Sequence, residues 1–191
     1  MRLFVLARHA QSTLNFARRV NGDPSVPAPL TAAGREEARS LGLQLRPLPL
    51  DLCVHTQFGR TLETAQLAVA GREVPLVEEP ELGDIRIGEL EGRTIGDYRA
   101  WKRRHSRSDP FPGGESLDAA ARRYGEAFAR LLELPHDCVL VVCHEIPIRY
   151  ALNAAAGSDD LDSPTHDVPN ATPFLFGAQE LRAAAVRLQR I

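Results

Sequence analysis

Short apolar runs alternate along this chain with longer segments in which apolar residues recur every three or four positions. Short runs of this kind are typical of buried strands, and the wider spacing is typical of amphipathic helices. The predicted strands cover residues 3–7, 50–55, 74–77, 138–143, 172–176 and 184–188. The predicted helices follow Thr31 and Ser116 and cover residues 60–70, 94–105 and 146–156. This alternation predicts an α/β fold, a three-layer α/β/α arrangement with a mostly parallel central sheet.

Residues that favour helix ends stand at the ends of several predicted helices. Thr31 and Ser116 have side chains that can accept a hydrogen bond from the first turn of a following helix. Gly71 and Gly157 follow two other predicted helices and are typical of helix C-termini. Gly177 lies between the last two predicted strands, so we expect it to form the turn that joins them.

Residues 80–114 follow neither pattern for long. The segment has four scattered glycines before a final glycine pair, mixed charge and the only tryptophan of the chain. We therefore predict one domain, residues 1–191, in which residues 80–114 leave the sheet and pass over the functional site. The segment has three large apolar side chains, Ile87, Tyr98 and Trp101. Two interpretations stay open: they line an entrance to the site, or they anchor the segment to the core.

Composition and charge exclude several classes of partner. The chain has 191 residues, of which 43% are hydrophobic and 25% charged, with a formal net charge of -2. Nucleic acid selects strongly basic surfaces, so it is excluded as the main partner. No apolar run approaches the ~20 residues of a membrane-spanning helix, and the N-terminal run is too short for a signal peptide. We expect a cytoplasmic protein whose partner is a small molecule; a homodimer stays open, because no exposed apolar stripe stands out.

The cysteines agree with a reducing compartment. Cys53, Cys138 and Cys143 are odd in number and lie within apolar runs, which argues against a disulfide framework. We interpret all three as buried core thiols.

Basic and imidazole side chains follow three of the predicted strands. Arg8 and His9 follow the first strand, Arg60 begins the helix after the second, and His144 follows the strand that covers residues 138–143. Ligands of open parallel sheets bind beyond the carboxyl ends of the strands, so these side chains are expected to converge there. Guanidinium groups and helix N-termini bind phosphate oxygens, and a neutral imidazole can attack phosphorus without a metal. The pattern therefore predicts metal-free phosphoryl transfer.

Each of these residues has another explanation when it is taken alone. A single histidine after a strand is more often a structural hydrogen-bonding group, and Arg60 by itself could lie on a helix surface. A metal site at His9 and His144 is the sharper rival, but Ile148 stands where a zinc protease would place its second helical histidine. The chain also lacks the glycine-rich sequences of nucleotide-binding loops. We therefore expect neither a metal nor an organic cofactor.

A series of short motifs extends this prediction along nearly the whole chain. The first is Arg-His-Ala-Gln-Ser at residues 8–12, followed by Asn15. The others cover residues 29–35, 56–65, 82–92, 112–116, 142–144 and 170–172. In sequence and in order, these motifs resemble those of the histidine phosphatase superfamily, which includes the cofactor-dependent phosphoglycerate mutases. The resemblance implies a phosphoglycerate mutase-like fold and chemistry through a phosphorylated histidine.

The resemblance also implies a role for each residue of the predicted site. It makes His9 the nucleophile that becomes phosphorylated, and it makes Arg8, Arg60 and protonated His144 the pocket that binds the phosphoryl group. It adds Ser12 and Asn15 to the substrate-binding residues.

The general acid departs from the family pattern. The family uses a glutamate, and counting back from Gly88 places Asp84 at that position. Aspartate is one methylene shorter and more acidic, with a pKa of about 3.9 against 4.3, so it needs closer placement and a raised pKa to donate a proton at neutral pH. If Asp84 lies on the surface instead, Glu89 or Glu91 is the alternative acid.

Glu145 is a second departure, because the family has glycine after its second histidine. A carboxylate at this position could repel a dianionic substrate. We expect the side chain to point away from the site, while the backbone N–H of Glu145 faces the phosphate and contributes to substrate binding.

These residues predict a phosphomonoesterase that acts on small phosphorylated metabolites. In the expected mechanism His9 attacks phosphorus while Asp84 protonates the leaving oxygen, and Asp84 then activates the water that hydrolyses the phosphohistidine.

Two other functions stay open. A phosphoglycerate mutase-type phosphoryl transferase is favoured by the basic pair Arg103 and Arg104, but the mutases carry longer insertions where this chain has the short segment 80–114. An inactive phosphate-binding regulatory module is favoured by the two departures at Asp84 and Glu145.

Overall fold

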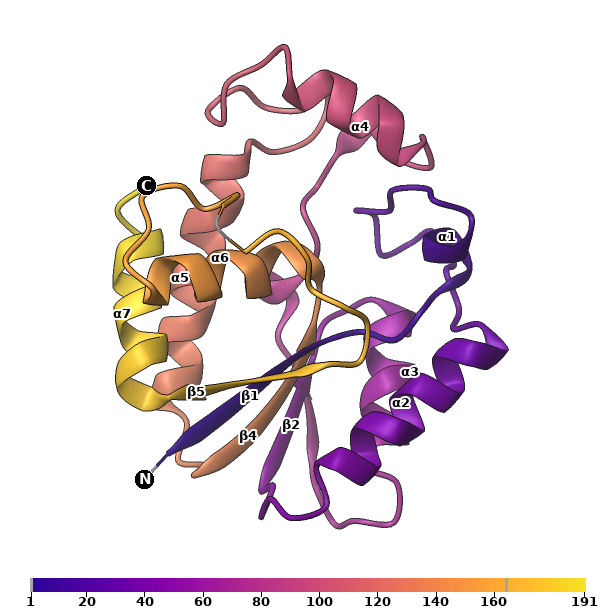
Figure 1. The fold of residues 1–191 in the computed structure, drawn as a ribbon, viewed down its shortest axis with the longest axis vertical. Coiled ribbons are helices and arrows are strands. Elements are labelled where there is room, and N and C mark those ends of the chain that lie inside the picture. Colours follow the sequence, from indigo (N-terminus) through magenta and orange to yellow (C-terminus); the bar gives the residue numbers. More distant parts are fainter. Residues whose placement is uncertain (1, 164) are drawn as a thin grey trace.

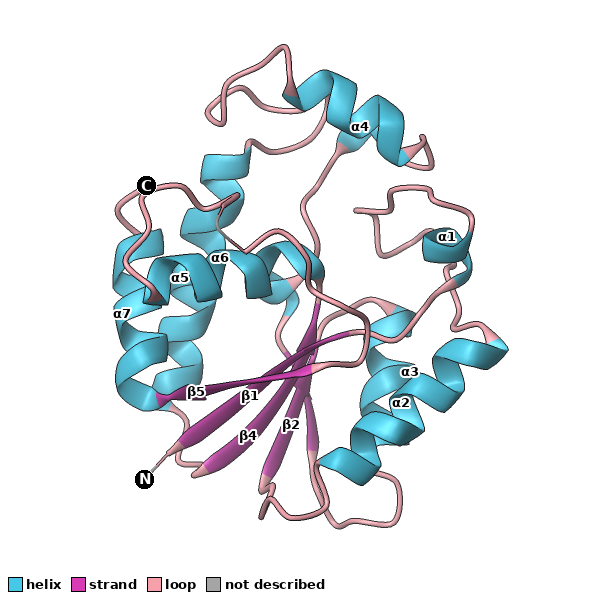
Figure 2. Ribbon diagram, viewed as in Figure 1, coloured by secondary structure: helices cyan, strands magenta, loops and turns pink. Residues whose placement is uncertain are grey.

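A central sheet organises the molecule, as Figures 1 and 2 show. The computed structural model describes residues 2–163 and 165–191. Within them, five strands lie in the order β3-β2-β4-β1-β5: β1 (Leu3–Arg8), β2 (Leu52–His55), β3 (Leu76–Glu78), β4 (Cys138–Cys143) and β5 (Pro173–Gly177). The first four strands pair in parallel, and β5 pairs antiparallel with β1. The prediction of a mostly parallel sheet is confirmed, with β3 at one edge.

Helices cover both faces of the sheet (Figure 1). One face carries α5 (Leu117–Glu133), α6 (Glu145–Ala155) and α7 (Ala178–Leu188), and the other carries α2 (Ala32–Gln44) and α3 (Gly59–Ala68). Two shorter helices, α1 (Thr13–Phe16) and α4 (Ile95–Lys102), lie beyond the carboxyl ends of the strands, and two 3-10 turns cover Pro80–Leu82 and Gly88–Leu90. The three-layer α/β/α prediction is confirmed.

Successive side chains of β1 point to opposite faces of the sheet and so contribute to two separate apolar cores. Phe4 and Leu6 join the core on the side of α5, α6 and α7, whereas Val5 and Ala7 join the core beneath α2 and α3. Because both faces are covered, the strand is a continuous apolar run rather than an alternating one.

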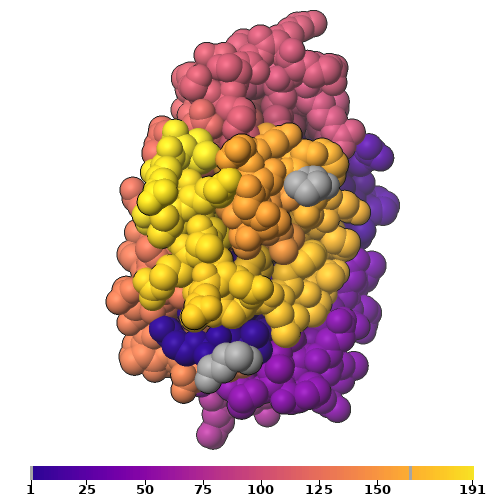
Figure 3. All heavy atoms as spheres, turned by 60° about the vertical axis from the view of Figure 1, so that its left-hand side comes forward, coloured from indigo at the N-terminus to yellow at the C-terminus, as the bar shows by residue number. Residues whose placement is uncertain are grey.

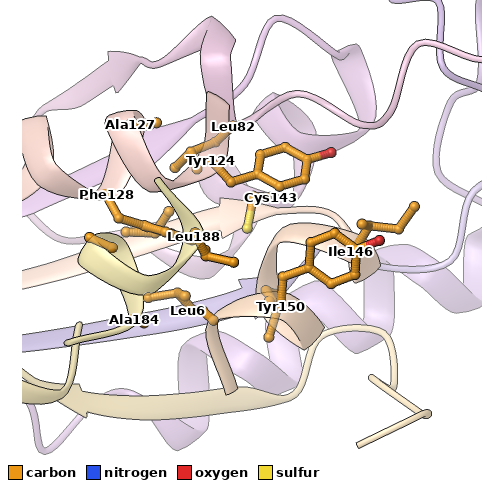
Figure 4. Close-up of a cluster of buried hydrophobic side chains, with 14 of the residues drawn as sticks. Leu6, Leu82, Tyr124, Ala127, Phe128, Cys143, Ile146, Tyr150, Ala184 and Leu188 are labelled. Carbon is orange, nitrogen blue, oxygen red and sulfur yellow. The ribbon is translucent and has the colours of Figure 1, made fainter. Parts of the chain in front are cut away.

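Phe128 of α5 belongs to the same core cluster as Leu6 and Leu188 (Figure 4), and it is fully buried. Phe128→Ala should lower the free energy of unfolding by about 3–5 kcal/mol, because it removes a ring from a packed site and leaves a cavity. Urea denaturation measures the change. Phe16→Ala is the matched control: this ring is 76% exposed, so its loss should cost less than about 0.5 kcal/mol. Equal effects would contradict the assignment of the core.

The helix-capping predictions are confirmed at Thr31 and Ser116. The hydroxyl oxygen of Thr31 accepts a 2.9 Å hydrogen bond from the backbone of Gly34, and that of Ser116 accepts one of 3.0 Å from Ala119. After α6, Gly157 has a φ of +79°, a left-handed conformation that glycine adopts without strain. These local sequence signals therefore predicted the helix ends correctly.

The prediction of a last strand over residues 184–188 is wrong, because this segment belongs to α7. The buried residues of α7 recur at helical spacing and face the neighbouring helices: Leu181, Ala184, Ala185 and Leu188. The alanine-rich sequence favours a helix, and the apolar period becomes clear only when the window is extended back to Leu181. Gly177 accordingly precedes a helix instead of forming a hairpin turn.

Residues 80–114 rise above the carboxyl end of the sheet and form one end of the molecule (Figures 1 and 3). Aromatic packing holds this segment together: Phe111 is buried and contacts Tyr98 and Trp101, with ring centroids 5.5 and 4.2 Å away. Lys102 adds an ion pair of 3.1 Å to Asp162, which follows α6. Aromatic packing and this ion pair therefore both hold the segment in place.

Two further observations bear on the sequence predictions. Cys53, Cys138 and Cys143 are all buried and free, as expected. Within residues 2–163 and 165–191, no helix is long and apolar enough to cross a membrane.

Candidate active site

His9 lies immediately after β1 and is 2% exposed. Its Nδ1 is 2.8 Å from the carbonyl oxygen of Ala10, and its Nε2 is 3.0 Å from Nε of Arg60. A carbonyl oxygen can only accept and a guanidinium N–H can only donate, so Nδ1 carries the proton and Nε2 presents a lone pair. Burial and the nearby charges of Arg60 and Arg8 lower the pKa of His9 well below its usual value. His9 is therefore neutral at physiological pH, with an unprotonated nitrogen in the site.

Arg60, near the start of α3, connects the residues around His9. Its guanidinium is 4% exposed and lies 4.3 Å from the centre of the Phe58 ring. Nη1 donates to the side-chain oxygen of Asn21, and Nη2 donates to the backbone oxygen of the same residue at 3.1 Å. Nη2 also lies 3.4 Å from Oδ2 of Asp84 and 3.2 Å from Nδ1 of His144. These contacts fix the orientation of one charged fork at the floor of the site.

His144 directly follows β4, at the N-cap of α6, and is completely buried. Its Nε2 is 3.0 Å from the Thr56 hydroxyl, and its ring centre is 5.3 Å from that of His9. Burial and the charge of Arg60 lower the pKa of His144 well below its usual value. The expectation of a protonated His144 is therefore wrong for the free protein, because a buried imidazole next to a guanidinium retains a proton poorly.

Asp84 lies above the two histidines on the segment that follows Pro80–Leu82. Its Oδ2 faces Arg60 at 3.4 Å and His144 at 3.5 Å, and its Oδ1 accepts a 2.9 Å hydrogen bond from the backbone of Ile85. The side chain is 23% exposed, so it is accessible from the cavity. Burial raises the pKa of Asp84, and Arg60 opposes this effect.

The two alternative acids lie outside the cavity. Glu89 is exposed to solvent. Glu91 accepts hydrogen bonds from the backbone of Gly22 and Asp23 at 2.7 and 3.0 Å, and so holds the loop that carries Asn21. The structure therefore brings Asp84, and neither glutamate, into the site.

Glu145 differs from the prediction, because its side chain lines the cavity instead of pointing away. Its Oε2 is 3.0 Å from Nη1 of Arg8, and its Oε1 is 3.2 Å from Nη1 of Arg149. Arg149 lies one turn further along α6, and Arg8 lies at the end of the adjacent β1, so the carboxylate fits between two guanidinium groups. The two ion pairs explain why the side chain turns inward.

Ser12 and Asn15 line the cavity and also hold each other. The backbone N–H of each donates to the side-chain oxygen of the other, at 3.1 and 3.3 Å, which caps α1. Asn170, from the last of the sequence motifs, donates from Nδ2 to the backbone oxygen of His9 at 2.6 Å. The three residues thus help to position the chain around His9.

The cavity has a volume of about 450 Å³, enough for a small metabolite. The sequence analysis missed several of its polar residues, which have no motif of their own: Arg19, Asn21, Arg99, Lys102 and Arg149. Of the residues it left open, Ile87 and Tyr98 line the cavity, whereas Trp101 packs on Phe111 and His105. Arg103 and Arg104 are exposed and lie outside it. Arg99 and Lys102 line the cavity because residues three positions apart lie on the same face of a helix, here the inner face of α4.

The lining side chains give the cavity a net positive charge. Among the described residues, six basic and two acidic side chains line it, the acidic ones being Asp84 and Glu145. Converging guanidinium groups around an unprotonated imidazole suit a phosphoryl dianion. The described residues contain no group of three or more His, Cys, Asp or Glu side chains placed to hold a metal ion.

Fold and site thus define an α/β protein with a positively charged cavity built on two histidines and several arginines. The family model of the histidine phosphatase superfamily (branch 1) matches residues 4–189, and the chain belongs to this superfamily.

Individual relatives include both phosphatases and mutases. A probable phosphoglycerate mutase GpmB of Proteus mirabilis is 29% identical over 160 residues, which cover 80% of this chain and 74% of that protein. The alpha-ribazole phosphatase from Shigella flexneri has a similar structure, with a TM-score of 0.79, 27% identity, and coverage of 91% of this chain and 89% of that one. TTHB049 from Thermus thermophilus is 31% identical with a TM-score of 0.67, covering 91% and 92% of the two chains.

Proposed function

We propose that this protein is a phosphomonoesterase that acts through a phosphohistidine formed on Nε2 of His9. The observation that carries the proposal is the tautomer of His9. Its Nδ1–H is bound to the backbone, and its Nε2 lone pair lies at the bottom of a cavity lined by Arg8 and Arg60. Nε2 is unprotonated, so it can attack phosphorus once the Nε–H of Arg60 turns from this lone pair to a phosphate oxygen.

In the first step the Nε2 lone pair attacks phosphorus and forms an N–P bond. The ester P–O bond breaks, and the leaving oxygen takes the proton of Asp84, so the product alcohol is neutral. In the second step the Asp84 carboxylate takes a proton from a water molecule whose oxygen attacks phosphorus. The N–P bond breaks, His9 is regenerated, and inorganic phosphate leaves.

The arginines stabilise the charge that develops in both steps. Arg60 and Arg8 present fixed guanidinium groups to the equatorial oxygens. Neutral His144 supports them indirectly, because its Nδ1 accepts a hydrogen bond from Nη2 of Arg60 and so helps to hold the orientation of that group. Because Asp84 is 23% exposed at the cavity, water can reach it once the alcohol has left, which favours hydrolysis over transfer to a second substrate. The phosphatase among the structural relatives agrees with this choice.

Incubation with a generic phosphomonoester tests the proposal. The expected result is release of inorganic phosphate together with an acid-labile phosphoprotein in rapidly quenched samples. An absence of both would favour an inactive phosphate-binding module, and transfer of the phosphoryl group to an added acceptor in place of water would favour a mutase-type transferase.

The outer part of the cavity favours substrates with a second anionic group. Arg19, Arg99 and Lys102 line this part. Lys102 pairs with Asp162, whereas Arg19 and Arg99 form no ion pair among the described residues and so add positive charge beyond what the reacting phosphate needs. A carboxylate or a second phosphate on the substrate would lie among them. A panel of phosphomonoesters should therefore show higher kcat/KM for phosphorylated carboxylic acids than for neutral alcohol phosphates of similar size.

Arg99→Ala should raise KM for a phosphorylated carboxylic acid by about two- to fivefold, the effect of one partly screened charge, and should leave a neutral substrate nearly unchanged. Steady-state kinetics with both substrates measures the difference. Arg103→Ala is the matched control, because it removes the same charge from an exposed position just after the same helix. An equal effect of both variants would contradict the assignment.

A further inference from the structure

Two carboxylates line the cavity, and the mechanism above uses only one of them. Oδ2 of Asp84 lies 3.5 Å from Nδ1 of His144, and Glu145 is the residue that follows this histidine. Both oxygens of Glu145 are held, one by Arg8 at 3.0 Å and the other by Arg149 at 3.2 Å. Glu145 is therefore a fixed negative charge beside the phosphate-binding arginine, in the same cavity as Asp84.

The charged groups that face Asp84 mostly oppose its protonation. The charged and titratable groups near Asp84 come from every surrounding element: Arg8 and His9 at β1, Arg60 on α3, Tyr98 on α4, Arg123 and Tyr124 on α5, Cys143 at the end of β4, and His144 and Glu145 at α6. Arg123 donates to the backbone oxygen of Asp84 at 3.3 Å and is itself paired with Glu115. Arg60 and Arg8 favour the ionised carboxylate. The two histidines have lowered pKa values and the two tyrosines raised ones, so all four are neutral near pH 7. Glu145 is the one negative group in this set.

We propose that Glu145 is a positioning residue that favours the protonated form of Asp84, the form that acts as general acid. Its charge opposes a second negative charge at Asp84, and its pairing with Arg8 reduces the positive potential that would ionise Asp84. The inference rests on the proposed function, because the proton on Asp84 matters only if this residue protonates the leaving group.

The electrostatic environment agrees with this role. Burial raises the pKa of Asp84, the charges of Arg60 and Arg8 lower it, and the charge of Glu145 raises it again. An aspartate needs this help more than a glutamate would, because its intrinsic pKa is about 3.9 against about 4.3. Glu145 also has a cost: its carboxylate occupies Nη1 of Arg8, which the phosphate of a substrate would use.

The pH dependence of kcat/KM tests the inference, because it reports the protonation of groups in the free enzyme. The general acid must be protonated, so kcat/KM falls as the pH rises through the pKa of Asp84. Glu145→Gln removes the charge and keeps an oxygen for the arginines, and it should move this alkaline limb to lower pH. For each pH unit by which the limb moves, kcat/KM at pH values above the limb falls about tenfold. Glu145→Asp retains the charge and should keep the limb close to its wild-type position.

Two comparisons separate this effect from a structural one. The loss in Glu145→Gln should be larger for an alkyl phosphate than for p-nitrophenyl phosphate, whose leaving group needs no proton. Glu36→Gln is the matched control: it removes one carboxylate from the exposed Glu36–Arg39 pair on α2, and it should leave the profile unchanged. An unmoved alkaline limb in Glu145→Gln, or an equal loss at every pH and with both substrates, would overturn the inference.

The proposed function and this inference fail in different ways. If the wild type releases no phosphate, or if it does so without His9, the proposed function is wrong. If the wild type is active and requires both His9 and Asp84, but Glu145→Gln retains the wild-type alkaline limb, only the role of Glu145 is wrong.

Discussion

His9→Ala is expected to abolish phosphate release, with a loss of at least about 10⁴-fold in kcat, and to abolish the acid-labile phosphoprotein as well. The variant removes the nitrogen that forms the N–P bond, and no other described nucleophile takes its place: the nearest imidazole, His144, is held between Arg60 and Thr56. Rapid-quench labelling with a radioactive phosphoester measures both losses. Substantial activity without labelling would show that water attacks the substrate directly.

His55 provides a matched control for this variant. It follows the same local pattern at the end of β2, since its Nδ1 is 2.9 Å from the carbonyl oxygen of Thr56 and its side chain is buried. It does not line the cavity. His55→Ala should therefore show a similar loss of thermal stability to His9→Ala, while phosphate release and labelling stay close to those of the wild type. Inactivity of both variants would point to misfolding as the cause.

Asp84→Asn is expected to lower kcat for alkyl phosphates by about 10²- to 10⁴-fold, the usual contribution of a general acid. An amide cannot donate a proton to the leaving oxygen or take one from water. The first step should be affected much less with p-nitrophenyl phosphate, so phosphohistidine should accumulate with this substrate because its hydrolysis still needs a base. A burst of p-nitrophenol followed by slow turnover is the expected kinetic signature.

Glu89→Gln is the control for the identity of the acid. Glu89 is exposed and lies outside the cavity, so this variant should keep wild-type rates with both substrates. A large loss in Glu89→Gln together with a small one in Asp84→Asn would move the role of acid to Glu89 and contradict the assignment.

The elements of the fold were largely predictable because their signals are local. Capping side chains at Thr31 and Ser116 mark helix starts, and apolar runs such as residues 138–143 mark strands that are buried on both faces. The prediction failed where an apolar run was too short to show its period. Residues 184–188 show their helical period only together with Leu181, and the packing of α7 against α5 and α6 confirms the helix.

The inner site was also predictable, because its residues follow strand ends and lie in recognisable motifs. Arg8, His9, Arg60 and His144 do meet, and Asp84 joins them. The outer cavity was not predictable from motifs. Arg19 comes from a loop, and Arg99 and Lys102 come from the inner face of α4, so only the position of residues 80–114 above the sheet brings them to the same space.

The sequence by itself determined the layered α/β fold and the residue types around the candidate site, because secondary structure and strand-end chemistry are encoded within short segments. Only the tertiary structure decided the charge state and orientation of those residues. Burial beside Arg60 makes His144 neutral, and the guanidinium groups of Arg8 and Arg149 turn Glu145 into the cavity. Such effects depend on distances of 3–4 Å between residues far apart in the chain, because Coulomb interactions and desolvation act through space rather than along the sequence.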